Sequence, residues 1–132
     1  MNLGATLYVR NSKAAADFYC EAFNMTIGYN AEHADGTFLH AELERAGNSI
    51  FAVSESTDEA IRAAMISANQ PTMSLGINLD TDEELYRAFS FLEKGGHVLR
   101  PIGSLPWSPY SADVVDKFGV CWYLFVSQHR PD

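Results

Sequence analysis

The fold is decided by two stretches of sequence: LGATLYVRNSKAAADFYCEAF at residues 3–23, and LGINLDTDEELYRAFSFL at residues 75–92. Each stretch begins with apolar residues at every second position, which is the period of a β-strand. Each continues with apolar residues at helical spacing, behind Asn11 and Ser12 in the first stretch and Thr81 in the second. Because these residue types cap helix N-termini, both stretches predict a strand followed by a helix.

Three more strands are expected after each of the two helices. In the first half they cover residues 27–32, 37–44 and 49–53, and in the second half residues 97–102, 112–115 and 120–126. Residues 57–70 predict a connector with one short helix, which Pro71 ends. The segment 103–110 contains Pro106, Trp107 and Pro109 and is expected to be a loop.

The two halves therefore repeat one order of elements, at an offset of about seventy residues. Several positions correspond across the repeat: Val9 with Leu79, Ala15 with Leu85, Tyr19 with Phe89, Gly47 with Gly119, and Phe51 with Tyr123. We expect an α+β fold in a single domain, residues 1–132, made of module one (1–56), the connector (57–71) and module two (72–132). Two tandem βαβββ modules would form a cupped mixed or antiparallel sheet around a cleft.

Composition excludes several classes of function. The chain has 132 residues, nine Lys and Arg against seventeen Asp and Glu, and a net charge of −8, so nucleic acid is not expected as a partner. The acidity favours either simple solubility or a cationic ligand. The longest apolar run, residues 120–126, is far shorter than the roughly 20 residues of a membrane-spanning helix. No signal peptide is recognisable, so a cytoplasmic location is expected, with Cys20 and Cys121 as reduced, unreactive thiols.

Three motifs resemble the vicinal oxygen chelate superfamily, which includes glyoxalase I, the bleomycin-resistance proteins and the extradiol dioxygenases. The opening motif combines residues 8–12 (YVRNS), 18–19 (FY) and 21–23 (EAF). Residues 38–43 (FLHAEL) resemble the third strand of the PhnB-like branch, and Trp107 with residues 116–122 (DKFGVCW) resembles its closing signature. The resemblance implies paired βαβββ modules and a homodimer, often with clefts built from both chains.

The resemblance also implies where a metal would bind in the metal-using members. Their four chelating positions fall on Gly4, Phe51, Ser74 and Tyr123 in this chain. None of these is His, Glu, Asp or Gln, which a divalent cation needs in number. We therefore expect no bound metal and no cofactor. Lyase or dioxygenase chemistry of the metal-dependent kind would then lack its electrophile.

Strand alternation sorts side chains between the two faces of each sheet. If Leu3, Ala5, Leu7 and Val9 face the helix, and Leu39, Ala41 and Leu43 do so too, the residues between them face the cleft. The predicted cleft residues are Tyr8, Arg10, Phe38, His40, Phe51, Asn78, Trp107, Tyr123 and Phe125. Such a face is either a ligand pocket or a second core, in the latter case covered by a dimer partner.

Four polar or aromatic residues of the predicted cleft each have two possible roles. His40 and Glu42 point the same way, so they are candidate catalytic residues, a base and its orienting carboxylate, or else a histidine satisfied by a neighbour. Arg10 is a candidate anchor for an anionic ligand or a surface ion pair. Trp107 is a candidate lid over the cleft or a plug between subunits.

The sequence thus predicts a metal-independent protein of the glyoxalase/bleomycin-resistance type that binds a small organic molecule. Whether a reaction is catalysed is left open. The alternatives are a metal-dependent lyase or dioxygenase, a protein that sequesters a cationic, bleomycin-like antibiotic, and a non-catalytic dimeric scaffold.

Overall fold

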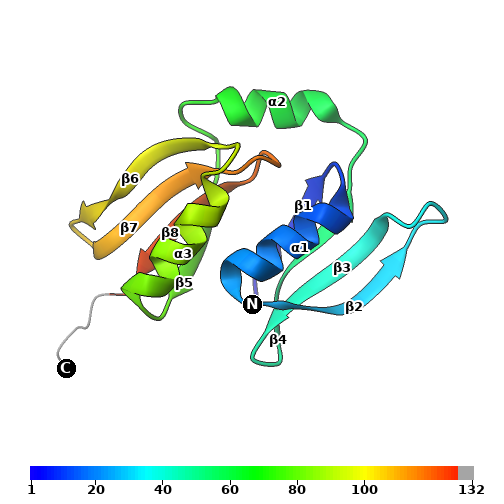
Figure 1. The fold of residues 1–132 in the computed structure, drawn as a ribbon, viewed down its shortest axis with the longest axis horizontal. Helices are drawn as coiled ribbons and strands as arrows, with labels where there is room; N and C mark the ends of the chain where they lie inside the picture. The colour runs from blue at the N-terminus through cyan, green and yellow to red at the C-terminus, as the bar shows by residue number, and fades with distance from the viewer. Residues whose placement is uncertain (128–132) are drawn as a thin grey trace. The chain divides into compact units, whose positions relative to one another are not determined.

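The structure, a computed structural model, describes residues 1–127 and divides the chain into two compact units, Met1–Ala60 and Ile61–Asp132. The first unit holds β1 (Thr6–Val9), α1 (Ser12–Phe23), β2 (Thr26–Glu32), β3 (Phe38–Arg45) and β4 (Asn48–Glu55). Its sheet has the order β1-β4-β3-β2, with β1 parallel to β4 and the other pairs antiparallel (Figure 1). From here on, module one denotes this unit, Met1–Ala60, and module two denotes the second unit.

The second unit, module two, repeats this architecture. It contains β5 (Leu75–Leu79), α3 (Asp82–Leu92), β6 (His97–Leu105), β7 (Ser108–Val115) and β8 (Cys121–Val126). The strand order is β5-β8-β7-β6, and β5 is parallel to β8 (Figure 1). The helix α2 (Glu59–Ser67) lies in the predicted connector. The prediction of an α+β fold with tandem βαβββ modules is therefore confirmed. No helix within residues 1–127 is long and apolar enough to cross a membrane.

Two details of the predicted elements are wrong. The first strand begins only at Thr6, and Leu3 before it is fully exposed instead of facing the helix. The predicted loop 103–110 consists largely of strand, because β6 and β7 form a hairpin whose turn is Pro106 and Trp107. The prolines that suggested a loop are tolerated because Pro106 lies in the turn and the β6–β7 ladder shifts register near Pro109.

One face of each sheet is covered by the module's own helix. In module one the ring of Phe51 on β4 packs edge-on against Tyr19 and Phe23 of α1, with centroids 5.7 and 6.5 Å apart. In module two, Trp122 and Leu124 on β8 are fully buried, as is Leu85 on α3. Burial of each such side chain stabilises the fold by about 1.5–3 kcal/mol, so these helix-covered faces are the two cores.

Two β-bulges in module one change which side chains reach its core. Leu39 is an extra residue in β3, because Ala31 pairs with His40 whereas the next residue of β2 pairs with Phe38. Ile50 is likewise extra in β4. An extra residue reverses the alternation beyond it. Leu39 is consequently 54% exposed, while Phe38 is buried.

The N-terminus of α1 is capped by a residue from a distant strand. Asn11 has a left-handed backbone (φ 63°) and makes no side-chain cap, contrary to the sequence prediction. Instead the Glu55 carboxylate of β4 accepts hydrogen bonds from the backbone N–H groups of Asn11 (3.0 Å) and Ser12 (2.7 Å). Partial burial raises the pKa of Glu55, but these bonds and the charge of Arg10 lower it more, so that the pKa lies below its usual value.

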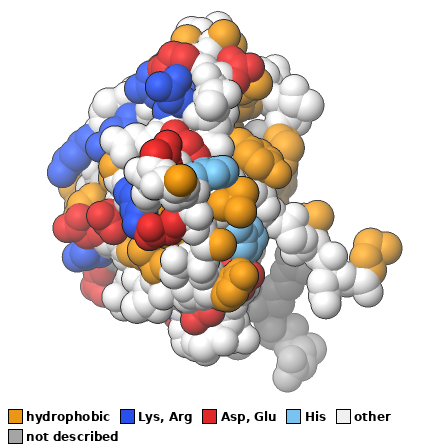
Figure 2. Space-filling view, turned by 90° about the vertical axis from the view of Figure 1, so that its right-hand side faces the viewer, with side chains coloured by type: hydrophobic (Ala, Val, Ile, Leu, Met, Phe, Trp, Pro, Cys, Tyr) orange, Lys and Arg blue, Asp and Glu red, His pale blue; other side chains and the backbone are white. Residues whose placement is uncertain are grey.

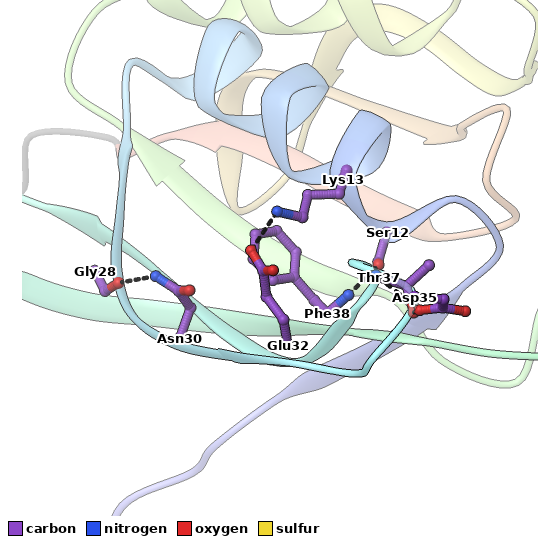
Figure 3. A network of polar contacts seen from close by, with 8 residues as sticks. All are labelled: Ser12, Lys13, Gly28, Asn30, Glu32, Asp35, Thr37 and Phe38. Carbon is purple, nitrogen blue, oxygen red and sulfur yellow. Dashed lines mark hydrogen bonds and ion pairs between the residues drawn. The ribbon is translucent and has the colours of Figure 1, made fainter.

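The side chains next to this cap join α1 to the β2–β3 hairpin. The Ser12 hydroxyl accepts a hydrogen bond from the backbone N–H of Phe38 at 2.9 Å. Lys13 lies over the Phe38 ring, 4.5 Å from its centroid, and its ammonium group pairs with Glu32 (Figure 3). The β2–β3 turn is held by Asp35, whose carboxylate accepts from Thr37. Phe38 is therefore fixed beneath α1.

The turn before β8 is held by the buried carboxylate of Asp116. One oxygen accepts from the backbone N–H groups of Phe118 (2.8 Å) and Val120 (3.1 Å), and the other from the indole of Trp122 (2.8 Å). Gly119 has a positive φ of 88°, and a Cβ there would lie 3.1 Å from the backbone of Arg62 on α2. Asp116 and Gly119 thus build this turn and have a structural role.

Replacing Glu55 by Gln is expected to lower the free energy of unfolding at pH 7 by about 1 kcal/mol, because the amide caps the helix without charge. Since the pKa of Glu55 is lowered by folding, its contribution is complete at neutral pH and declines as the pH falls below 4.5. The difference between wild type and variant in urea unfolding should therefore shrink below that pH. Glu93→Gln, at an exposed position of module two, is the matched control. Equal effects of both substitutions would contradict the capping role.

Candidate functional site

The face of each sheet that its own helix leaves uncovered, here called the helix-free face, carries the candidate functional residues. In module two its centre is the pair Tyr123 and Phe125 on β8, whose rings stack with centroids 5.0 Å apart and planes 14° apart. On β5, Gly76 and Asn78 lie directly opposite these two residues. A Cβ on Gly76 would touch both rings, at 3.6 and 3.7 Å. The glycine therefore leaves a flat, exposed surface beside the aromatic pair.

Polar residues of β7 and β6 lie on the other side of this aromatic pair. Asp113 is opposite Tyr123, and Ser111 is opposite Phe125. The Arg100 guanidinium donates from Nε to Asp113 at 2.7 Å and from Nη2 to the Ser111 hydroxyl at 2.7 Å. Arg100 and Asp113 thus form an ion pair, with about a quarter of each side chain exposed.

The hydroxyl of Tyr123 lacks a hydrogen-bond partner. Its oxygen is buried, yet no donor or acceptor within residues 1–127 reaches it. A buried hydroxyl without a partner costs about 1–3 kcal/mol of desolvation. Because folded proteins rarely leave such a group unpaired, this atom marks a place where a further molecule can contribute an interaction.

The helix-free face of module one carries a second cluster of polar and aromatic side chains. His40 Nε2 lies 3.1 Å from Glu42 Oε2, and both side chains are about one-third exposed. The ring of Tyr29 lies 6.3 Å from that of His40. Tyr8, 72% exposed on β1, pairs in register with Ser54. In Figure 2, histidine side chains lie among hydrophobic side chains on the surface in view, and acidic side chains lie beside Lys and Arg side chains.

Phe38 and Phe51 do not belong to these faces, so their assignment to the cleft is wrong. Phe38 lies under Lys13 of α1, and Phe51 packs on α1 itself. The bulges at Leu39 and Ile50 explain both errors, because each reverses the alternation that sequence reasoning assumes to be unbroken.

Arg10 and Trp107 have positions that the alternation did not predict. Arg10 follows the end of β1 and donates to the carbonyl of Thr57 at 3.4 Å, close to Glu55. It therefore helps to hold the chain at the end of β4. Trp107 is 61% exposed in the turn of the β6–β7 hairpin. Asn78, Tyr123 and Phe125, by contrast, do share one face.

The residues at the implied chelating positions do not fit a divalent metal ion. Gly4 has no side chain, and Phe51 is apolar and buried in the core. The strand register pairs Tyr123 with Gly76 in module two and Ala52 with Thr6 in module one, so a shift of the implied positions by one or two residues supplies no carboxylate or imidazole either. Within residues 1–127, no three His, Cys, Asp or Glu side chains gather in a group that could hold a metal. Hydroxyl groups alone are poor ligands for zinc, iron or nickel.

The two thiols are poor nucleophiles. Burial, followed by the charges of Asp113 and Asp116, raises the pKa of Cys121 to about 11. Burial and the nearby Asp17 also raise the pKa of Cys20. Because the thiolate is the reactive form, both cysteines stay protonated at neutral pH, as the sequence analysis expected.

Sequence reasoning missed Tyr29, Gly76, Ser111 and Asp113 as members of the helix-free faces. A bulge in β2 displaces Tyr29 from simple alternation. Asp113 lies within the predicted strand 112–115 and could have been found, because it alternates with the buried Ala112 and Val114. Ser111 precedes that predicted strand and was therefore not assigned to a face. Gly76 was overlooked because it has no side chain.

Comparison with known proteins supplies a family model and several similar structures. The model described as the glyoxalase/bleomycin resistance protein/dioxygenase superfamily matches residues 4–124. A PhnB protein from Bacillus cereus is 26% identical, with a TM-score of 0.75 over 96% of this chain and 100% of that one. Protein PA1353 from Pseudomonas aeruginosa is 24% identical, with a TM-score of 0.72 over 98% of this chain and 99% of that one.

More distant structures share the fold. The fosfomycin resistance protein FosX from Listeria monocytogenes is 13% identical, with a TM-score of 0.67 over 97% of this chain and 94% of that one. At this identity the likeness concerns the fold alone. No curated protein sequence matches the chain significantly.

Truncation of Phe51 on β4 and of Phe125 on β8 should change the free energy of unfolding by different amounts. Phe51→Ala removes a ring from the core of module one and is expected to lower the free energy of unfolding by about 3–4 kcal/mol. Phe125→Ala removes a half-exposed ring from a helix-free face and should cost only about 1 kcal/mol. Urea unfolding followed by circular dichroism measures both. A Phe125 variant as unstable as the Phe51 variant would show that this face is a core.

Proposed function

The chain belongs to the glyoxalase/bleomycin resistance protein/dioxygenase superfamily, and on that basis we propose that it binds a small organic molecule without a protein-bound metal. The observation that carries the proposal is the stacked pair Tyr123 and Phe125 beside Gly76 on the helix-free face of module two. Aromatic walls with a few placed polar groups are the usual composition of a ligand site. Asn78 and the Tyr123 hydroxyl supply the polar groups here.

Metal independence is supported by the side chains at the chelating positions. A metal-dependent lyase or dioxygenase of this superfamily would need carboxylates or imidazoles where this chain has Gly4, Phe51, Ser74 and Tyr123. A non-catalytic scaffold would not require a glycine beside two half-exposed, stacked aromatic rings. Binding of an organic ligand accounts for both features.

The binding proposal predicts that the purified native protein holds less than roughly a tenth of an equivalent of any transition metal, by plasma mass spectrometry. It also predicts that planar organic compounds in a screening panel raise the thermal unfolding midpoint. Phe125→Ala should weaken the best such compounds by about tenfold, because a stacked ring contributes about 1–1.5 kcal/mol.

Phe91→Ala, which removes a half-buried ring from α3 instead, is the matched control and should leave affinity unchanged. Near-stoichiometric metal, removed by a chelator with loss of ligand binding, would contradict the metal-independent function. Failure of the whole panel to bind would contradict the binding function itself.

A second candidate function is acid–base catalysis by His40 and Glu42. The 3.1 Å contact between Nε2 and the carboxylate would orient the imidazole, whose other nitrogen could exchange a proton with a substrate. Both side chains are partly exposed, so a substrate could reach them. Without an identified substrate this function ranks below binding.

If the protein turns over a compound found by the screen, His40→Ala should reduce kcat by about 100-fold or more. Glu42→Gln keeps a hydrogen bond to the imidazole but removes the charge, and should cause a smaller loss. His33→Ala, on the exposed β2–β3 loop, is the control. Unchanged turnover in the His40 variant would exclude the catalytic pair.

A further inference from the structure

The charges on the helix-free face of module two cancel each other locally. Asp113 is the acidic residue next to Tyr123, and its carboxylate is paired with Arg100 at 2.7 Å. The remaining guanidinium donors of Arg100 go to the hydroxyl (2.7 Å) and the carbonyl (3.5 Å) of Ser111. Arg100 and Asp113, the charged residues of the described part of the chain beside Tyr123, thus neutralise each other, so that neither is free for a charged ligand.

The other ionisable groups that the register places on this face do not change that balance. Cys121 is protonated and neutral, since its pKa is raised to about 11. His97 pairs with Val115 on the edge strand β6, two strands away from Tyr123. Among residues 1–127, the strand register therefore surrounds the aromatic pair with neutral groups and with the Arg100–Asp113 ion pair.

The groups that remain for recognition are neutral and polar. The Tyr123 hydroxyl has a hydrogen to donate and no partner within residues 1–127. The Asn78 amide, opposite Phe125 on β5, is exposed and can both donate and accept. The Tyr123 side chain as a whole is half-buried, whereas its hydroxyl oxygen is buried, so a ligand can bind this oxygen only after the side chain has turned outward.

We infer that the ligand of this face is a neutral, planar molecule with a hydrogen-bond acceptor such as a carbonyl oxygen, which the Tyr123 hydroxyl binds. This inference rests on the proposed binding function and specifies its ligand class. The flat surface at Gly76 accepts the planar part beside the stacked rings, and Asn78 adds a second polar contact. A cationic compound, bleomycin-like or other, would have to desolvate its charge without gaining a free carboxylate here.

Three isosteric probes that differ in charge test the ligand class: 2-naphthamide, 2-naphthoate and 2-naphthamidinium. Each probe is titrated into isotopically labelled protein, and backbone amide chemical shifts are measured by NMR. Binding should shift the amide signals of Gly76, Asn78 and Ser111. The neutral amide is expected to bind about tenfold more tightly than either charged probe, because neither charge finds a partner.

The role of the hydroxyl is tested by Tyr123→Phe, which should weaken the amide about five- to tenfold, as expected for loss of one hydrogen bond. Tyr110→Phe removes a tyrosine hydroxyl from the opposite face of the same sheet and is the matched control. Without ligand, the Tyr123→Phe protein should unfold at the same urea concentration as wild type or at a higher one, because the substitution removes a buried hydroxyl that has no hydrogen-bond partner. A merely structural hydroxyl would instead lower that concentration.

Each remaining outcome is decisive. A charged probe that binds as tightly as the amide, or an amide affinity unchanged in the Tyr123 variant, would overturn the ligand class while leaving the binding function intact. If none of the three probes shifts these signals at millimolar concentration, the ligand class is again wrong. In that case the compound panel with its Phe125 variant decides separately whether the protein binds small molecules.

Discussion

The rest of the structure depends on the parallel pairing of the first and last strands within each module, β1 with β4 and β5 with β8. This pairing fixes which residue of the last strand lies beside each residue of the first. Through that register it decides which side chains meet the helix and which meet the helix-free face. Gly76 lies beside Tyr123 for this reason alone, although the two are far apart in sequence. The candidate ligand surface is thus a product of topology.

The two modules share their topology but use their faces differently. In module two the last strand runs without interruption along β7, and its alternation places Tyr123 and Phe125 on one face. In module one the extra residue Ile50 interrupts β4, so the counterpart of Tyr123 is Ala52, and Phe51 becomes a core residue. The aromatic surface therefore exists in one module, and the histidine–carboxylate pair in the other.

Sequence analysis predicted the order of elements, the repeat and the fold class, because periodicity and helix signals are local properties. Within the helix-free faces it correctly grouped Asn78, Tyr123 and Phe125, whose strands have no irregularity. It misplaced Phe38 and Phe51, because a bulge is decided by pairing between strands and leaves no local signal. The homodimer, the cytoplasmic location and the lid role of Trp107 stay predictions, because a single chain does not test them.

The cap that Glu55 provides has a consequence for phosphorylated compounds. Helix N-termini often bind phosphate through free backbone N–H groups and the positive end of the helix dipole. At α1 the Glu55 carboxylate already binds two of those N–H groups, of Asn11 and Ser12. At α3 the first turn carries Asp82, Glu83 and Glu84, whose charges repel an anion. At α2 the first turn carries Glu59, whose charge also repels an anion. The N-termini of α1, α2 and α3 therefore disfavour phosphate, so that nucleotides and sugar phosphates would have to be recognised by other means.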